Sequence, residues 1–251
     1  MSCLQIDHQA GQVHILLNRP DRGNALSPEL VLALSQSLSA AYADENVHTV
    51  VLHGKGPHFC TGFDLSDLEQ LSDGDLLWRI VQVELLLGLV WRAPVRTVAV
   101  AQGRAWGAGA DLFAACERRC VLSAATLKFP GVHFGIALGT RRLSQRVGED
   151  MARRWLIDGS EINAQQALQA GLATDQTDSA REFLAQLATP VASVATGACL
   201  REATRSGLRD QADADLAQLV RSAAVPGLRD RILRYREQLR ASRTLPRPPG
   251  A

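Results

Sequence analysis

Lysine is nearly absent from this chain of 251 residues, in which only Lys55 and Lys128 occur. Arginine therefore supplies almost all of the positive charge. The 27 basic and 26 acidic residues nearly cancel and leave a formal net charge of +1. Nucleic-acid-binding domains usually carry a basic surplus, which this chain lacks. We therefore expect no nucleic-acid partner, and RNA binding has only the arginine excess in its favour.

Cysteine is scarce and shows no pattern. The chain has five cysteines, an odd number without the spacing of a disulfide framework, which favours reduced thiols in a cytoplasmic protein. Cys116 and Cys120 could share a helix face, but no histidine or further cysteine is near enough in sequence to complete a zinc site. His53 and His58 lack an acidic partner at a suitable spacing. We expect no metal ion.

Long apolar runs are also missing. None is long enough to cross a bilayer, and Met1–Asp7 does not resemble a signal peptide, so we expect no membrane association and a cytoplasmic location. The composition is that of an ordinary globular protein, 46% hydrophobic and 21% charged. A chain of this length can bury a sizeable core.

Short apolar runs alternate with helical patterns through most of the chain. A hairpin turn is expected at Ala10–Gln12, and Ser27 is expected to cap a helix that begins at Pro28. The long apolar helix is expected to lie across a functional site. Expected strands are 4–8, 13–17, 49–53, 97–101 and 118–124, with 127–129 extended; expected helices are 28–42, 65–71, 75–91, 110–116, 140–147, 149–157 and most of the chain after 178.

One glycine-rich turn, Gly103–Asp111, joins the strand at 97–101 to a helix of small residues. The first amides of a helix have no partner within it and lie at the positive end of its dipole. Such a turn can therefore present N–H groups to an anion or to a carbonyl oxygen that becomes negative. The alternative is a packing turn that only brings the helix close to a sheet.

A second loop, His58–Leu65, follows the apolar run 49–53 and has the same order of strand, glycine-containing loop and helix start. Two such loops on neighbouring strands could direct two N–H groups at one oxygen. Together with two further stretches, Asn18–Leu26 and Ile162–Leu172, these loops resemble the crotonase (enoyl-CoA hydratase/isomerase) superfamily. Phe59–Leu65 resembles its F-C-A-G-x-D-L loop, and Gly103–Asp111 resembles its N-G-x-x-x-G-G-G-x-E turn.

The resemblance covers nearly the whole chain and implies an α/β fold. Residues 1–190 would form the crotonase-like ββα spiral core, 191–243 a C-terminal helical region, and 244–251 a disordered tail. In the family the C-terminal helices hold a trimer and can close over a neighbour's site. We therefore expect a homotrimer, or a hexamer that is a dimer of trimers.

The resemblance also implies an acyl-CoA thioester as substrate, with coenzyme A entering as part of it and no separate cofactor. The backbone N–H groups of Phe63 and Ala108 would form an oxyanion hole for the thioester oxygen. The family usually has glycine at the second position. Because the donor is a backbone group, Ala108 can still serve.

Hydration in this family uses two glutamates that hold one water. The first corresponds to Asp111, an acid of shorter reach, and the second to Gly131, which has no carboxylate. Ordinary hydratase activity is therefore in doubt. His133 is a candidate to replace the missing group because histidine carries protons at neutral pH; the alternative is a loop residue that faces solvent.

Candidate substrate-binding residues follow from the same loops. Phe63 and Trp106 are expected to wall a pocket, Arg22 lies where the family has a basic residue near the CoA phosphates, and Asp64 is expected to cap the short helix after it. The binding set is Arg22, Ala25, Leu26, Thr61, Gly62, Asp64, Leu65, Trp106, Gly107 and Gly131.

Two classes of function remain. One is an acyl-CoA enzyme of the enoyl-CoA hydratase/isomerase family, acting in fatty acid metabolism, with Asp111 as the acid or base. Isomerisation, decarboxylation of a malonyl-type thioester and hydration assisted by His133 all remain open. The other class is a non-catalytic paralogue that binds CoA thioesters.

Overall fold

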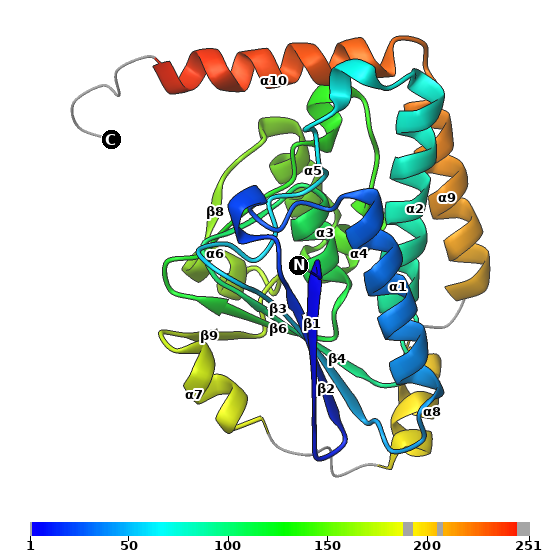
Figure 1. The fold of residues 1–251 in the computed structure, drawn as a ribbon, viewed down its shortest axis with the longest axis vertical. Coiled ribbons are helices and arrows are strands. Elements are labelled where there is room, and N and C mark those ends of the chain that lie inside the picture. Colours follow the sequence, from blue (N-terminus) through cyan, green and yellow to red (C-terminus); the bar gives the residue numbers. More distant parts are fainter. Residues whose placement is uncertain (1, 188–192, 205–207, 245–251) are drawn as a thin grey trace.

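A six-stranded sheet forms the centre of the structure, a computed structural model that describes residues 2–187, 193–204 and 208–244 (Figure 1). The strands lie in the order β1-β2-β3-β4-β6-β9. β1 and β2 pair antiparallel, and the remaining neighbours pair parallel. The bounds are Leu4–Gln9 for β1, Gln12–Leu17 for β2, Thr49–Gly54 for β3, Arg96–Ala101 for β4, Arg118–Leu122 for β6 and Asp175–Thr177 for β9.

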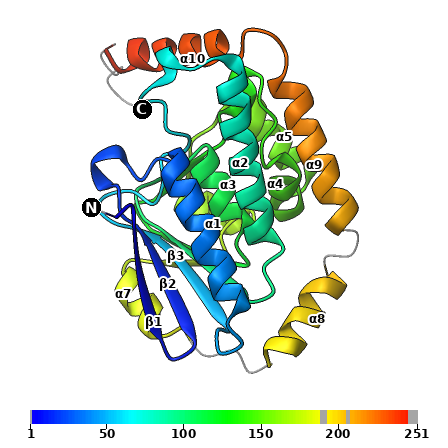
Figure 2. The ribbon, with the colours of Figure 1, turned by 45° about the vertical axis from the view of Figure 1, so that its right-hand side comes forward.

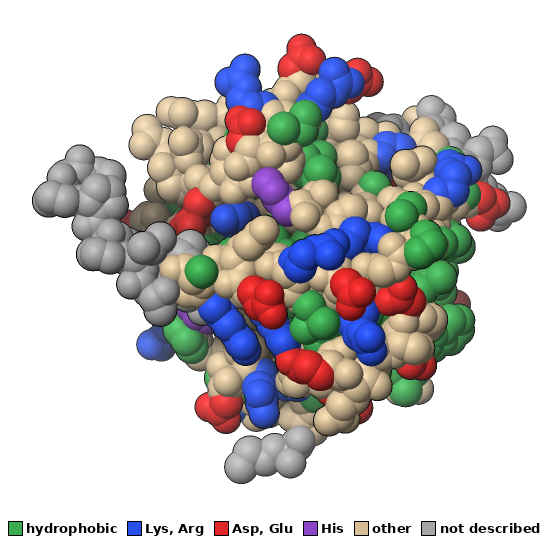
Figure 3. All heavy atoms as spheres, turned by 90° about the horizontal axis from the view of Figure 1, so that it is seen from above, with side chains coloured by type: hydrophobic (Ala, Val, Ile, Leu, Met, Phe, Trp, Pro, Cys, Tyr) green, Lys and Arg blue, Asp and Glu red, His purple; other side chains and the backbone are tan. Residues whose placement is uncertain are grey.

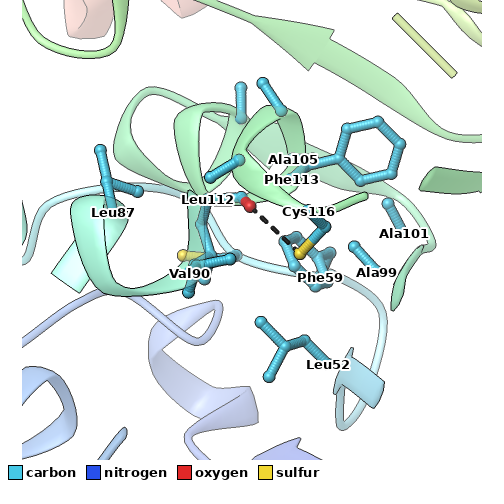
Figure 4. Close-up of a cluster of buried hydrophobic side chains, with 14 of the residues drawn as sticks. Leu52, Phe59, Leu87, Val90, Ala99, Ala101, Ala105, Leu112, Phe113 and Cys116 are labelled. Carbon is cyan, nitrogen blue, oxygen red and sulfur yellow. Dashed lines mark hydrogen bonds between the residues drawn. The ribbon is translucent and has the colours of Figure 1, made fainter. Parts of the chain in front are cut away.

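The main core lies between this sheet and the helices α1 (Pro28–Ala43), α2 (Asp73–Trp91) and α3 (Ala108–Ala115). α1 begins as expected, since the Ser27 side chain accepts a hydrogen bond from the Leu30 amide. Figure 4 shows how β3, β4, α2 and α3 share one buried cluster, in which the Cys116 thiol donates to the Leu112 carbonyl at 3.5 Å. The other face of the sheet packs against α7 (Ala180–Ala185).

A smaller sheet was not expected from the sequence. It consists of β5 (Arg104–Trp106), β7 (Thr126–Lys128) and β8 (Ile162–Asn163). β5 lies inside the stretch expected to be one glycine-rich turn, because its backbone pairs in parallel with β7. The turn proper is thus the short segment between Trp106 and the start of α3, and the helix begins at Ala108 rather than Ala110.

Two expected helix boundaries were wrong. Residues 65–71 contain only the 3-10 turn η2 (Leu68–Gln70). α2 begins at Asp73 instead of Asp75, because the side chains of Ser72 and Asp75 form a reciprocal capping box. The remaining elements are η1 (Pro20–Arg22), η3 (Gly131–Phe134), α4 (Thr140–Val147), α5 (Glu149–Asp158), α6 (Ala164–Gln169), α8 (Val194–Thr204), α9 (Leu208–Ala223) and α10 (Leu228–Thr244).

The C-terminal helices α9 and α10 pack on their own chain (Figure 2). Leu219, Ala223, Leu228 and Ile232 join residues of α2 and η2 in a second buried cluster. The carboxylate of Asp73 accepts hydrogen bonds from the amides of Gly227, Leu228 and Arg229 at 2.8–3.1 Å. The start of α2 therefore caps the start of α10.

Seen from the α10 end of the molecule, basic and acidic side chains are interspersed rather than gathered by sign (Figure 3). In the described part of the chain, no helix combines the length and apolar character needed to cross a membrane. The five cysteines are free thiols. The domain boundary expected at residue 190 and the tail expected after 244 fall on residues outside the described ranges, and trimer formation stays a prediction.

Asp73→Ala should lower the free energy of unfolding by about 1 kcal/mol, the usual cost of a lost helix cap. Urea unfolding followed by circular dichroism measures this change. Glu237→Ala, an exposed change on the capped helix α10, is the control and should leave the midpoint unchanged. Equal midpoints for the two variants would contradict the capping role.

Candidate active site

A cavity of about 160 Å³ lies between the main core and the second buried cluster. The two loops that the sequence analysis singled out form one side of it, and α2, α5, η3 and α10 form the rest. Most of the lining is apolar. The lining residues are Thr61, Gly62, Phe63, Leu65, Ile80, Val83, Trp106, Gly107, Ala108, Asp111, Lys128, Phe129, Pro130, Gly131, Phe134, Ile136, Leu138, Leu156, Ile232, Tyr235 and Leu239.

The two loops are held side by side by the backbone pairing of Cys60 with Ala105. The first loop in chain order is also held to the segment before α1, through the pairing of Phe63 with Leu26. Gly62, at a φ of +101°, lies so close to the second loop that a Cβ there would be 2.8 Å from the Trp106 carbonyl oxygen and 3.4 Å from the Ala108 nitrogen. Glycine is needed at this position because of the positive φ and because the second loop leaves no room for a Cβ.

The amides of Phe63 and Ala108 border the cavity from these two loops. Among the described residues, neither amide donates a hydrogen bond, whereas their neighbours do. The Asp64 amide donates to the Leu26 carbonyl at 3.2 Å, and the Gly107 amide donates to the Lys128 carbonyl at 2.8 Å. Ala108 is the first residue of α3, so its amide has no acceptor within the helix. One amide from each loop therefore borders the cavity without an acceptor among the described residues.

Asp111 lies one helical turn beyond Ala108 and is 6% exposed. Its carboxyl group borders the cavity and packs on Gly139, where a Cβ would be 2.1 Å from Oδ1. No described residue donates a hydrogen bond to it. Burial raises the pKa of Asp111 well above its ordinary value, and the nearby Glu84 carboxylate adds to the rise while Arg142 opposes it.

Arg142 is engaged elsewhere. Its guanidinium holds both carboxylate oxygens of Glu84 at 2.6 Å, in a pair that is almost fully buried, and also lies 3.3 Å from Asp215. Asp215 in turn pairs with Arg141. This cluster lies on α2, α4 and α9, far apart in sequence, and sequence reasoning missed it.

Gly131 lines the cavity, so the position expected to lack a carboxylate does border the site. A Cβ there would lie 2.9 Å from the Ile136 carbonyl oxygen, too close without movement of that backbone. Asp111 is the one acidic side chain in the described lining. A water held between two carboxylates has no counterpart here.

His133, the candidate to replace that carboxylate, lies outside the cavity lining. It is exposed and stacks on Tyr235 with ring centroids 6.2 Å apart. Its imidazole packs against Gly159, where a Cβ would be 2.4 Å from Nε2. η3 turns the ring to the outside, so the solvent-facing alternative fits the structure.

The expected binding residues divide into two groups. Thr61, Gly62, Leu65, Trp106, Gly107 and Gly131 line the cavity, together with Phe63. The other four do not: Arg22 is exposed in η1, Ala25 and Leu26 are buried in the chain's interior, and Asp64 pairs with Arg19 at 2.8 Å. Asp64 also accepts from the Ser66 amide, and the 3-10 turn that follows has no side-chain cap.

The wall formed by α2 and α10 was only partly foreseen. Ile80 and Val83 lie on the helix expected to cross the site, and they line the cavity. Ile232, Tyr235 and Leu239 share one stripe of α10, which the sequence shows as an apolar face without indicating what it covers. Within the described residues, no group of three or more histidine, cysteine or acidic side chains could hold a metal ion.

Three comparisons identify relatives. A family profile described as enoyl-CoA hydratase/isomerase matches residues 7–242. The chain is 35% identical to the enoyl-CoA hydratase AFT6-1 of Alternaria alternata over 170 residues, which cover 67% of this chain and 56% of that protein. The match therefore spans little more than half of that relative.

Solved structures share the fold. An enoyl-CoA hydratase/isomerase homologue from Bordetella parapertussis superposes with a TM-score of 0.88 at 40% identity, covering 93% of this chain and 98% of that one. An enoyl-CoA hydratase from Bacillus halodurans superposes with a TM-score of 0.82 at 22% identity, covering 93% and 100%, which supports the fold alone. The expected α/β crotonase-like fold is confirmed.

Gly139→Ala should destabilise the protein more than Gly135→Ala. Both glycines are in the left-handed region, with φ of +65° and +77°, so alanine strains both backbones; only at Gly139 would the methyl group also strike the Asp111 carboxyl, since the nearest atom at Gly135 is Nε of the flexible Arg231 side chain at 3.1 Å. The excess loss should be about 1–3 kcal/mol. Urea unfolding of both variants measures it, and equal losses would contradict the close packing of Asp111 on Gly139.

Proposed function

The chain belongs to the enoyl-CoA hydratase/isomerase family, and we propose that it is an enzyme that moves a double bond in an acyl-CoA thioester. Asp111 removes a proton from C2 of a 3-enoyl thioester, the negative charge builds on the thioester oxygen, and the same carboxyl returns the proton to C4. The observation that carries this proposal is that the buried Asp111 carboxyl group lines one cavity with two amides that have no acceptor among the described residues.

The amides of Phe63 and Ala108 supply the electrophilic half of the reaction. Two N–H groups fixed in a dry site stabilise a developing oxyanion without reorganising, and one such donor is worth about 3–4 kcal/mol. Lining by Phe129, Ile136 and Leu138 keeps the surroundings apolar. In such surroundings each hydrogen bond to a charged oxygen is stronger than in water.

Isomerisation fits this site better than hydration because it needs a single proton carrier. Hydration adds water across the double bond, and the water must be held and deprotonated while a proton is delivered to C2. With Gly131 in the lining and His133 outside it, no second acid or base borders Asp111 from those positions. Hydration, the activity in the names of relatives, is therefore not the reaction proposed for this chain.

Decarboxylation of a malonyl-type thioester is the second candidate. A raised pKa keeps Asp111 protonated over a wider pH range, and a protonated acid can quench the enolate that decarboxylation produces. Against it, the lining apart from Lys128 offers a malonyl carboxylate little compensation for its lost hydration.

Deuterium wash-in at C2 of a saturated acyl-CoA tests the proposed proton carrier. We expect wild-type protein to catalyse exchange in D₂O. The exchange rate of Asp111→Asn should be lower by about 100-fold or more, since positioned acid–base groups contribute about 10²–10⁴-fold. His133→Asn is the matched control and should keep most of the rate. NMR of the C2 hydrogens measures the exchange.

The pH dependence of the exchange rate tests the protonation state in which Asp111 acts. Exchange requires the ionised carboxylate, and the pKa of Asp111 is raised. The rate should therefore rise with pH, with a midpoint well above that of an exposed aspartate. If the protein binds the thioester but catalyses no exchange at any pH, the enzyme proposal is wrong and a non-catalytic paralogue is favoured.

A further inference from the structure

We infer that the acyl group accepted by this site is uncharged, apolar and about six carbons in size. The inference rests on the proposed acyl-CoA function and adds the class of acyl group. Three features of the cavity carry it: the chemistry of the lining, the volume, and the fixed position of the α10 wall.

The lining selects against charged acyl groups. Apart from the loops that carry the amides, the wall consists of aliphatic and aromatic side chains from α2, η3, α5 and α10. The charged members of the described lining are Asp111 and Lys128. Asp111 would repel an acyl carboxylate when ionised. The Lys128 ammonium lies 5.8 Å from the centroid of the Trp106 ring and is the one cation in the described lining with which an acyl carboxylate could pair. Away from Lys128, a carboxylate inside the cavity would lose its hydration without an ionic partner.

The volume limits the acyl group to about six carbons. The cavity measures about 160 Å³. An apolar engineered cavity of about 150 Å³ in another protein holds one benzene molecule, which has six carbons. A hexanoyl or hexenoyl chain, or one phenyl ring, is thus the largest apolar group that this cavity takes without rearrangement.

The α10 wall sets that limit because it is anchored on both sides of the cavity. Ile232 is 2% exposed and belongs to the second buried cluster. The Arg231 guanidinium donates to the Phe134 carbonyl at 3.0 Å, and Arg236 pairs with Glu69. With the Asp73 cap at its start, α10 is tied to α2, η2 and η3. A longer acyl chain has to displace these contacts.

Binding of saturated acyl-CoAs measures the preference independently of turnover. Isothermal titration of wild-type protein with acetyl-, butanoyl-, hexanoyl-, octanoyl- and dodecanoyl-CoA should show affinity rising by about fourfold per methylene up to six carbons, the factor expected for burying one methylene. Affinity should then stop rising or fall. Succinyl-CoA should bind more weakly than butanoyl-CoA, which has the same number of acyl carbons.

Variants of α10 test the wall itself. Ile232→Ala enlarges the cavity and should move the optimum to longer acyl chains. Leu239→Phe fills part of the cavity and should move the optimum to shorter ones. Gln238→Ala, exposed on the same helix, should keep the wild-type optimum. Thermal unfolding confirms that each variant is folded before titration.

The outcomes separate the inference from the function beneath it. Binding that does not depend on chain length, an optimum at two or at twelve carbons, or tight binding of succinyl-CoA would overturn the inference while leaving an acyl-CoA site in place. If no acyl-CoA of any length binds, both the proposed function and the inference are wrong.

Discussion

Burial of the Asp111 carboxyl group without a hydrogen-bond donor from the described residues is the constraint on which the site depends. A carboxyl group in such a place costs free energy, and ionising it costs more, because the lost hydration is not replaced. A chain selected for stability alone would have an apolar residue there. The position makes sense if the missing partner is a substrate that exchanges a proton with this group.

The same short helix joins the acid to the electrophile. Ala108 and Asp111 are the first and fourth residues of α3, so one helical turn positions an amide without an acceptor and a carboxyl group on the same cavity. The Phe63 amide reaches that cavity only because Gly62 lets the two loops approach. Geometry set by backbone pairing, rather than by flexible side chains, keeps the two amides fixed.

The buried pair of Glu84 and Arg142 acts on the pKa of Asp111 in two opposite directions. Arg142 alone would favour an ionised Asp111, but its guanidinium is already bonded to both oxygens of Glu84. Glu84 also acts on Asp111 directly and raises its pKa. The cluster therefore links α2, α4 and α9 through ion pairs without neutralising the carboxyl group in the cavity.

Local patterns predicted the local structure well. The hairpin, the Ser27 cap and five of the six strands of the large sheet follow from residues close together in sequence, and the two loops followed from the resemblance. β9 was not predicted, because it is only three residues long and is defined by its pairing with β6. The errors came from interactions at a distance or from competing caps: β5 forms because β7 lies beside it, and α2 starts early because Ser72 and Asp75 cap each other.

The cavity wall could not be predicted in the same way. That Ile232, Tyr235 and Leu239 face the site of their own chain depends on how α10 docks on α2 and η3. His133 and Gly131 are two residues apart, yet η3 turns one outward and leaves the other in the lining. Adjacency in sequence is a poor guide to adjacency at a site across a 3-10 turn.

The fate of the hydrogen removed from C2 tests the central claim, that a single carboxyl group carries the proton from C2 to C4 in a largely apolar cavity. A 3-hexenoyl-CoA labelled with deuterium at C2 would be converted in H₂O, and the product 2-hexenoyl-CoA examined by mass spectrometry and NMR. The account predicts that part of the label reappears at C4, because Asp111 returns the atom it removed. Product with only solvent hydrogen at C4, or no conversion at all, would contradict it.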